Sequence, residues 1–320
     1  MVFTPYLFRF AYMHIPDGML SLSVSIICWL ITASLLIVAI RRTQYELGER
    51  QVPLMGIMAA FIFAAQMINF PVLGGTSGHL LGGALAAIAL GPWAGMLVMA
   101  AVIIVQGLLF QDGGILVMGA NILNMGILPA IIGYGFYRSV SRRSIRIRLG
   151  AAGFAAWLSV IAAALFTSLQ LWLSQTAQLN VVVPAMLSIH VLIGIGEALI
   201  TVAALSLIFR TRPELVTNEA GEERGSRGWI VAGALISLAV IFISPLASAD
   251  PDGLERVAIN LGFIHTAQSA PYHLLPNYTL PFLGQTPLST ILAGGVGALL
   301  VAGLTFLVVR LIRKPPQPVK

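Results

Sequence analysis

The chain has 320 residues, of which 58% are hydrophobic and only 9% carry a formal charge. Soluble domains contain roughly a quarter charged residues, so this composition excludes an ordinary soluble protein and indicates a bilayer as the solvent. The formal net charge of +6 does not indicate nucleic-acid binding, because the basic residues lie in short segments between long apolar runs.

Nine apolar segments are predicted as membrane-spanning helices. After Arg50 the next charged residue is Asp112, and Glu197 is the only one between Leu149 and Phe209. A span needs about 20 apolar residues, and backbone groups in lipid must pair within their own segment. The predicted fold class is therefore all-α, a polytopic transmembrane bundle with spans near 21–40, 53–69, 80–90, 92–110, 115–137, 150–173, 184–209, 229–247 and 288–312.

The positions of the basic residues predict how the bundle is oriented. With the N-terminus outside, the inner segments are 41–52, 138–149, 210–228 and the tail from 310. All of the 18 Lys and Arg residues except Arg9 and Arg256 then lie inside, as the positive-inside rule requires. The pattern favours an odd number of spans.

The polar segment 211–228 is predicted to be a cytoplasmic linker. It divides the chain into a seven-helix front part, residues 13–210, and a two-helix back part, residues 229–320, whose outer loop 248–287 has no strong period. Residues 1–12 are too short to span and lack the order of a secretion signal. We therefore expect translation to begin at Met13, or the extension to be removed.

The single cysteine, Cys28, allows no disulfide framework and is interpreted as a small packing residue.

Polar residues with ligand chemistry gather where this topology places the outer face. His14 and Asp17 precede the first span, and His79 ends a glycine-rich loop between the second and third spans. Both histidines therefore lie on the same side of the membrane. The other polar residues at this end are Gln106, Asp112, Asn121 and Asn124.

A chain that begins at Met13 has a metal chelate in its first two residues. The Met13 amine, the His14 amide nitrogen and His14 Nδ1 can bind one ion through low-strain rings, and His79 can take the fourth corner. Square-planar nitrogen sites suit Ni²⁺ or Cu²⁺, and Co²⁺ less comfortably. Mg²⁺ and Ca²⁺ prefer oxygen ligands.

The remaining polar residues are interpreted as supporting or structural. Asp17 is expected to hydrogen-bond the terminus or an imidazole N–H, and Gln106, Asn121 and Asn124 to orient His79 without binding metal. The alternative is that the histidines are solvated and the amides only pair helices.

His190 and Glu197 lie seven residues apart and share one face of the seventh span. A charge near mid-membrane usually faces the protein interior, where it relays ions or protons or packs by hydrogen bonding; packing is favoured here. The methionines are likewise interpreted as apolar filler rather than a thioether path. They are Met55, Met58, Met67, Met96, Met99, Met118 and Met125.

Several enzyme motifs are absent from the sequence. The two lysines, Lys314 and Lys320, do not precede Ser or Thr, so there is no phosphate-binding loop. Neither H-E-x-x-H nor G-x-S-x-G occurs. The chain is therefore interpreted as no enzyme, and any ATP hydrolysis belongs to another chain.

The ordered motifs of the front part resemble one family, the substrate-capture component of energy-coupling-factor cobalt and nickel importers. The residues that carry the resemblance are MHIPDGML at 13–20, GGTSGHLLGG at 74–83, LLFQDGG at 108–114, GANILNMG at 119–126 and IGIGEALIT at 193–201. In the back part, PDGLERVA at 251–258 resembles the small companion of that component, fused here through the linker.

The resemblance implies a metal site of Met13, His14 and His79 that faces out of the plasma membrane. It also implies seven helices in the front part, a pair of ATP-binding-cassette ATPases and a membrane coupling protein as partners, and Ni²⁺ or Co²⁺ as cargo. The fusion slightly favours nickel. The extension 1–12 departs from the family, in which the metal-binding methionine starts the chain.

Two other classes stay open at this point. A self-sufficient metal channel or secondary carrier would use His190 and Glu197 as a path, and uptake by this chain alone without ATP would favour it. A metal sensor would not transport at all. Neighbouring genes for an ATPase and a coupling protein would favour the importer.

Overall fold

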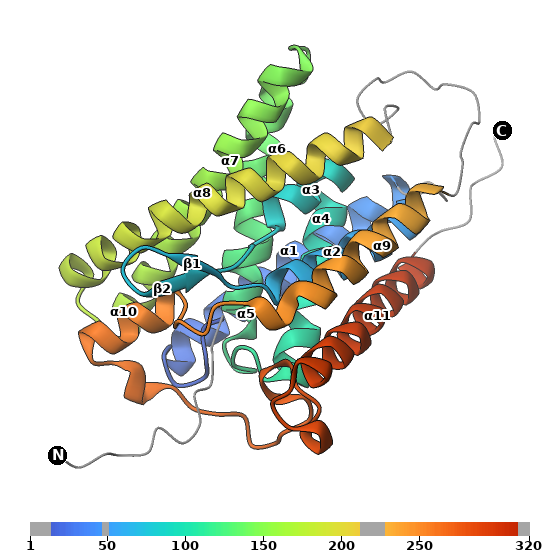
Figure 1. Ribbon diagram of the computed structural model, residues 1–320. Helices are drawn as coiled ribbons and strands as arrows, with labels where there is room; N and C mark the ends of the chain where they lie inside the picture. The colour runs from blue at the N-terminus through green and yellow to red at the C-terminus, as the bar shows by residue number, and fades with distance from the viewer. Residues whose placement is uncertain (1–13, 47–50, 212–227, 313–320) are drawn as a thin grey trace.

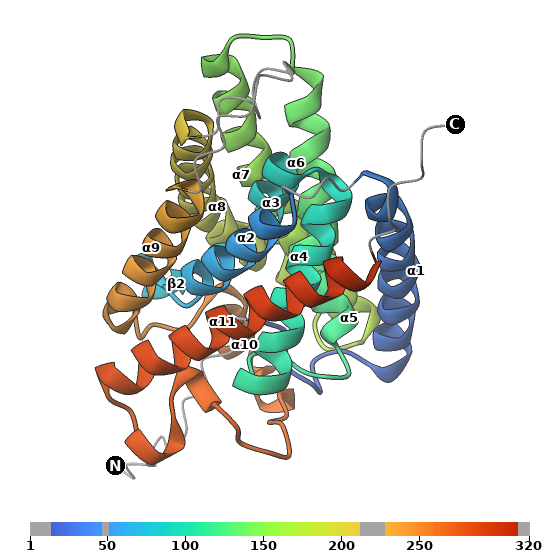
Figure 2. The same ribbon diagram turned by 90° about the vertical axis from the view of Figure 1, so that its right-hand side faces the viewer.

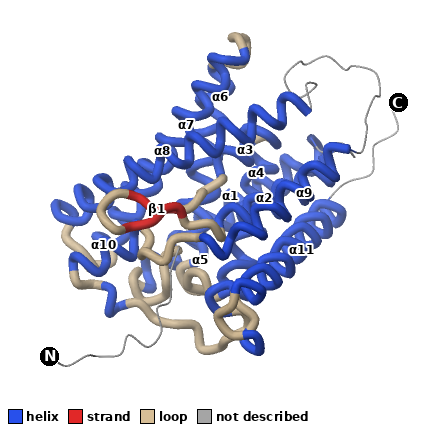
Figure 3. Tube along the Cα trace, viewed as in Figure 1, coloured by secondary structure: helices blue, strands red, loops and turns tan. Residues whose placement is uncertain are grey.

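The computed structural model describes residues 14–46, 51–211 and 228–312 (Figure 1). Met13, the extension 1–12 and all but the ends of the predicted linker 211–228 lie outside the described residues. The described residues contain eleven α-helices and one two-stranded hairpin (Figure 3), so the all-α class is confirmed.

The front part holds eight of these helices and the back part three. In the front part they are α1 (Leu22–Glu46), α2 (Gln51–Gln66), α3 (Gly83–Leu90), α4 (Pro92–Val105), α5 (Met118–Asn121), α6 (Leu128–Ser139), α7 (Ile145–Leu173) and α8 (Leu179–Thr211). Two stretches are π-helical. The first, η1 (Gln106–Phe110), extends α4, and the second, η2 (Ile122–Ile127), joins α5 to α6. The back part has α9 (Gly228–Ile243), α10 (Gly253–Leu261) and α11 (Pro287–Ile312).

Six described helical segments are long and apolar enough to span a membrane, and each coincides with a predicted span. They are Leu22–Tyr45, Pro92–Phe110, Met118–Ser139, Ile145–Leu173, Leu179–Arg210 and Pro287–Ile312. The predicted spans 53–69 and 229–247 correspond to the shorter apolar helices Val52–Gln66 and Ile230–Leu246.

The predicted span 80–90 needs correction, because α3 begins only at Gly83. Eight residues extend about 12 Å, against a hydrocarbon core of about 30 Å, so α3 cannot cross the membrane alone. Residues 79–82 before it are irregular, and Gly82 takes the left-handed conformation at φ 83°. Gly91, at φ 86°, ends the helix, and Pro92 begins α4.

Two short elements were not predicted from the sequence. The hairpin β1 (Phe70–Val72) and β2 (Thr76–Gly78) pairs antiparallel, with Phe70 opposite Gly78. In the loop 248–287, which shows no strong sequence period, α10 begins at an Asp252 cap whose carboxylate accepts from Glu255 N at 2.8 Å. Both elements are too short for periodicity to reveal.

The helices of the back part pack on the front part. Both α9 and α11 lie against α2, and α7 runs along α8 (Figure 2). The buried α3 packs against α4 and α6, and glycines permit the close approach. A Cβ at Gly95 would lie 2.7 Å from Ala87 Cα. Cys28 is buried in α1, as its packing interpretation requires.

Candidate metal site

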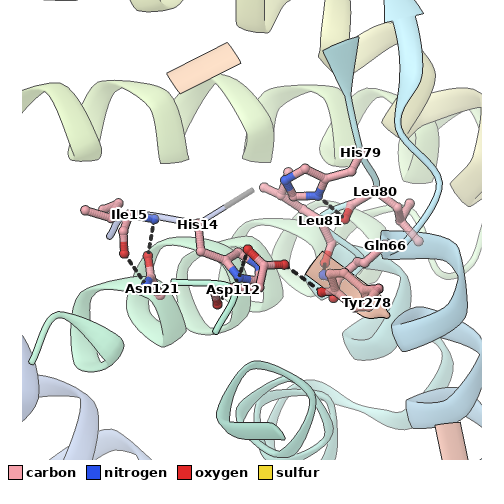
Figure 4. A network of polar contacts seen from close by, with 9 residues as sticks. All are labelled: His14, Ile15, Gln66, His79, Leu80, Leu81, Asp112, Asn121 and Tyr278. Atoms are coloured by element: carbon pink, nitrogen blue, oxygen red, sulfur yellow. Dashed lines mark hydrogen bonds and ion pairs between the residues drawn. The ribbon is translucent and has the colours of Figure 1, made fainter. Parts of the chain in front are cut away.

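Two imidazoles from distant segments meet in the interior. His14 lies at the start of the described chain and His79 follows β2; they are 2% and 7% exposed. Their ring centroids are 5.9 Å apart with an interplanar angle of 86° (Figure 4). Both line a cavity of about 70 Å³, whose wall also includes His190 of α8 and Asp252 of the back part.

Asp112, just after η1, holds the His14 ring. His14 Nδ1 donates to the Asp112 carbonyl oxygen at 2.9 Å and lies 3.3 Å from the Asp112 carboxylate. The Tyr278 hydroxyl donates to the other carboxylate oxygen at 2.6 Å (Figure 4). The back part therefore supplies a donor to the residue that holds His14.

The electrostatics of this pair follow from burial and mutual attraction. Burial by itself lowers the pKa of His14, but the Asp112 carboxylate outweighs it and the pKa is raised. Burial likewise raises the pKa of Asp112, but His14 and the Tyr278 hydroxyl bring it below its ordinary value. Burial raises the pKa of Tyr278 well above 10, so this residue acts as a neutral donor.

The hydrogen bonds also indicate which nitrogen of each ring donates to the backbone. His14 Nδ1 carries the proton that it donates to Asp112. The second ring nitrogen, Nε2, is buried and has no hydrogen-bond partner in the described structure. His79 Nδ1 bonds the Leu80 carbonyl at 3.0 Å, which assigns the ring lone pair to Nε2. The predicted chelate uses His14 Nδ1, so forming it requires the ring to leave Asp112.

Asp17 and Asn121 fasten the N-terminal segment to the start of α5. The Asp17 carboxylate accepts from three successive N–H groups, those of residues 115–117, at 2.9 to 3.2 Å. It does not bond an imidazole as expected, because this nest of backbone donors holds both oxygens. Asn121 bonds both backbone groups of Ile15, each at 3.0 Å.

The other two amides were interpreted either as orienting His79 or as only pairing helices. Asn124 forms a reciprocal pair with Gln170 of α7 at 2.7 and 3.0 Å, and also donates to Thr167. Its role is to join η2 to α7. Gln106 is fully buried at the start of η1, beside the Tyr278 hydroxyl.

His190 and Glu197, both on α8, have different surroundings. His190 lines the cavity, and its Nδ1 donates to the Met186 carbonyl at 2.7 Å. A Cβ on Gly253 would lie 3.1 Å from His190 Nε2, so only glycine fits there comfortably. Glu197 is fully buried and accepts from Leu81 N and Gly82 N at 2.6 and 2.9 Å.

The back part forms hydrogen bonds to the hairpin that precedes His79. Ser77 N donates to the Pro251 carbonyl at 2.9 Å, and Ser77 Oγ donates to the Asp250 carbonyl at 2.8 Å. Arg256 bonds the Gly75 carbonyl at the hairpin tip. Burial raises the pKa of the neighbouring Asp252 to about 8. The signature at 251–258 is thus the segment that meets the His79 loop.

Among the described residues, no three His, Cys, Asp or Glu side chains lie close enough together to hold an ion. His14 and His79 therefore need further donors to complete a coordination sphere. Tyr278 and Asp252 were missed by sequence reasoning, because an aperiodic loop does not reveal which of its residues will be buried.

Comparison with known proteins gives two family matches. Residues 14–215 match the family described as cobalt uptake substrate-specific transmembrane region, and residues 227–314 match the PDGLE domain. The chain is 38% identical over 309 residues to a putative fused nickel transport protein of Archaeoglobus fulgidus, covering 94% of this chain and 99% of that protein. A fused nickel transport protein of Rhodobacter capsulatus is 31% identical, with 91% and 96% covered.

A solved structure is also similar. It is described as the crystal structure of a truncated transition metal transporter, and it aligns with a TM-score of 0.57 at 34% sequence identity. The alignment covers 62% of this chain and 99% of that one.

Proposed function

Because the chain belongs to the cobalt uptake substrate-specific transmembrane family and is fused to a PDGLE domain, we propose that it captures Ni²⁺ or Co²⁺ at the outer face of the plasma membrane for ATP-driven import. His14 and His79 are the ligands from described residues, and Met13 supplies the terminal amine. The observation that carries the proposal is the meeting of these two buried imidazoles, 5.9 Å apart, at one cavity.

The chemistry of the donors supports a late transition metal as cargo. Imidazole nitrogens suit Ni²⁺ and Co²⁺, whereas Mg²⁺ and Ca²⁺ would need an oxygen cage. Two imidazoles do not complete a sphere, but the Met13 amine and the His14 amide nitrogen are next in the chain and add two more nitrogens. Loading would then exchange the His14 Nδ1 contact with Asp112 for a bond to the ion.

The order of events follows from this geometry. Binding of the ion would release the His14 Nδ1 proton and the His14 amide proton to solvent and move the ring away from Asp112, while the bonds of Ile15 to Asn121 keep the segment in place. Partner subunits, a pair of ATP-binding-cassette ATPases and a membrane coupling protein, then supply the energy, because this sequence has no phosphate-binding loop. Two relatives named as fused nickel transport proteins favour nickel over cobalt.

The chain start provides the first test. A protein that begins at Met13 is expected to bind Ni²⁺ at least about 100-fold more tightly than one that keeps residues 1–12, since the extension removes the amine and its chelate ring. Titration calorimetry of the two purified proteins measures the difference, and N-terminal sequencing checks that each chain start is intact. Equal affinities would exclude the terminal chelate.

Reconstitution tests the energy source. Proteoliposomes with the chain alone are expected to hold Ni²⁺ at the outer face without accumulating it, and accumulation should need the ATPases, the coupling protein and ATP together. Radioactive nickel uptake is the measurement, with a hydrolysis-deficient ATPase as the control. Accumulation by the chain alone without ATP would instead identify a self-sufficient carrier.

A further inference from the structure

The segment that carries His79 crosses the protein interior without regular structure. Residues 79–82 lie between β2 and α3, and His79 and Leu80 are both buried. Irregular backbone at membrane depth is tolerated only where the surrounding protein satisfies its polar groups. The partners of this short segment therefore decide where the His79 imidazole sits.

Glu197 of α8 supplies two of these partners. Leu81 N donates to Oε2 at 2.6 Å and Gly82 N donates to Oε1 at 2.9 Å, so each carboxylate oxygen takes one backbone donor. The start of α3 has no side-chain cap of its own. Glu197 therefore holds the N-cap residue of α3 and the residue before it, at the helix end where the dipole favours negative charge.

Other groups on α2 and α8 hold the same segment. Gln66 Nε2 of α2 donates to the Leu81 carbonyl at 2.8 Å (Figure 4). The N–H and the carbonyl of Leu81 are therefore both hydrogen-bonded to side chains. Ile193 lies about one turn before Glu197 on the same face of α8, and Gly196 directly precedes Glu197. Ile193 packs where Gly78 has no side chain, and Gly196 leaves room for the ring of Phe70 in β1.

This bonding argues against a relay at Glu197. A relay for ions or protons needs oxygen atoms that can exchange partners, whereas both oxygens here are engaged by N–H groups that belong to a packed backbone. Exchanging either partner would leave a buried donor unpaired, which is unfavourable. An anchoring role fits the contacts better.

We propose that Glu197 is a positioning residue of the metal site, whose carboxylate fixes the backbone just after His79 and so directs the imidazole toward the ion. The proposal rests on the proposed function, since it takes His79 as a metal ligand. Glu197 itself does not touch the ion and acts only through the Leu81 and Gly82 amides.

The test is Glu197→Gln, which keeps the size of the side chain but turns an amide NH₂ toward a backbone donor. The Ni²⁺ dissociation constant is expected to rise about 10–100-fold, the range for losing an outer partner of a metal ligand. The visible absorption of bound Ni²⁺ should shift as well, because the imidazole is misplaced. Thr201→Val is the matched control, since Thr201 is fully buried one turn later on α8 and its hydroxyl has no partner in the described structure.

A second variant covers the case in which Glu197→Gln does not fold. Gln66→Met removes only the donor to the Leu81 carbonyl, so we expect a smaller loss of affinity, about 10-fold. Thermal unfolding of the metal-free proteins shows which variants remain folded. If Glu197→Gln and Gln66→Met, where they fold, keep the wild-type Ni²⁺ affinity and absorption, the positioning role is overturned. If His79→Ala keeps the wild-type affinity, the proposed function itself is overturned.

Discussion

His79→Ala is expected to weaken Ni²⁺ and Co²⁺ binding by at least about 100-fold, because even the loss of an outer partner of a metal ligand costs about 10–100-fold. His14 and His79 are the two imidazoles that meet at the cavity, and no three His, Cys, Asp or Glu side chains of the described residues are grouped closely enough to hold an ion. The change is measured by titration calorimetry on detergent-solubilised protein whose chain starts at Met13.

The matched control is His273→Ala. His273 is exposed in the loop 248–287 of the back part, so its removal changes the histidine count but not the site. Its affinity should equal that of the wild type. Retention of wild-type nickel and cobalt binding by folded His79→Ala would remove this residue from the site and leave only the family assignment standing.

Gly83→Ala is expected to destabilise the fold by about 1–3 kcal/mol, the usual cost of inserting atoms into a well-packed core. A Cβ at Gly83 would lie 2.5 Å from the Met125 carbonyl oxygen and 3.0 Å from that of Gly126, both on the π-helical stretch η2. Backbone oxygens cannot rotate aside as a flexible side chain would. The start of α3 must therefore shift, and the His79 segment moves with it.

Gly150→Ala is the comparison for this change. Gly150 also lies within a helix, α7, but nothing approaches the position of its Cβ within 4 Å. Ala there should be neutral or stabilise by about 0.5–1 kcal/mol, since glycine is costly inside a helix. Thermal unfolding in detergent compares the two variants. Equal midpoints would mean that the α3–η2 contact is not as tight as described.

The spans and the membrane class were predictable because hydropathy is a local property of the chain. Six predicted spans coincide with long apolar helices, and the ordered motifs around His14 and His79 point to the family that the comparisons show. The predicted boundary between the spans 80–90 and 92–110 also falls where α3 ends and α4 begins. Local signals of this kind do not depend on which segments later become neighbours.

The roles of the polar residues depended on contacts between distant parts of the chain. Buried polar groups must find partners, but composition and spacing do not say which ones. Asp17 was expected at the terminus or an imidazole, and among the described residues it holds the backbone before α5, while Asn124 pairs with Gln170. Tyr278, from a loop without periodicity, lies 166 residues from Asp112 and still donates to it.

The sequence by itself determined that the chain is a multi-pass membrane protein, where its long apolar spans lie, and which two histidines are worth testing. Only the tertiary structure decided that Asp112 holds one of them and that Glu197 anchors the backbone beside the other. The physical reason is that hydrophobicity acts on each segment separately, whereas a buried hydrogen bond exists only once packing has brought its two ends together.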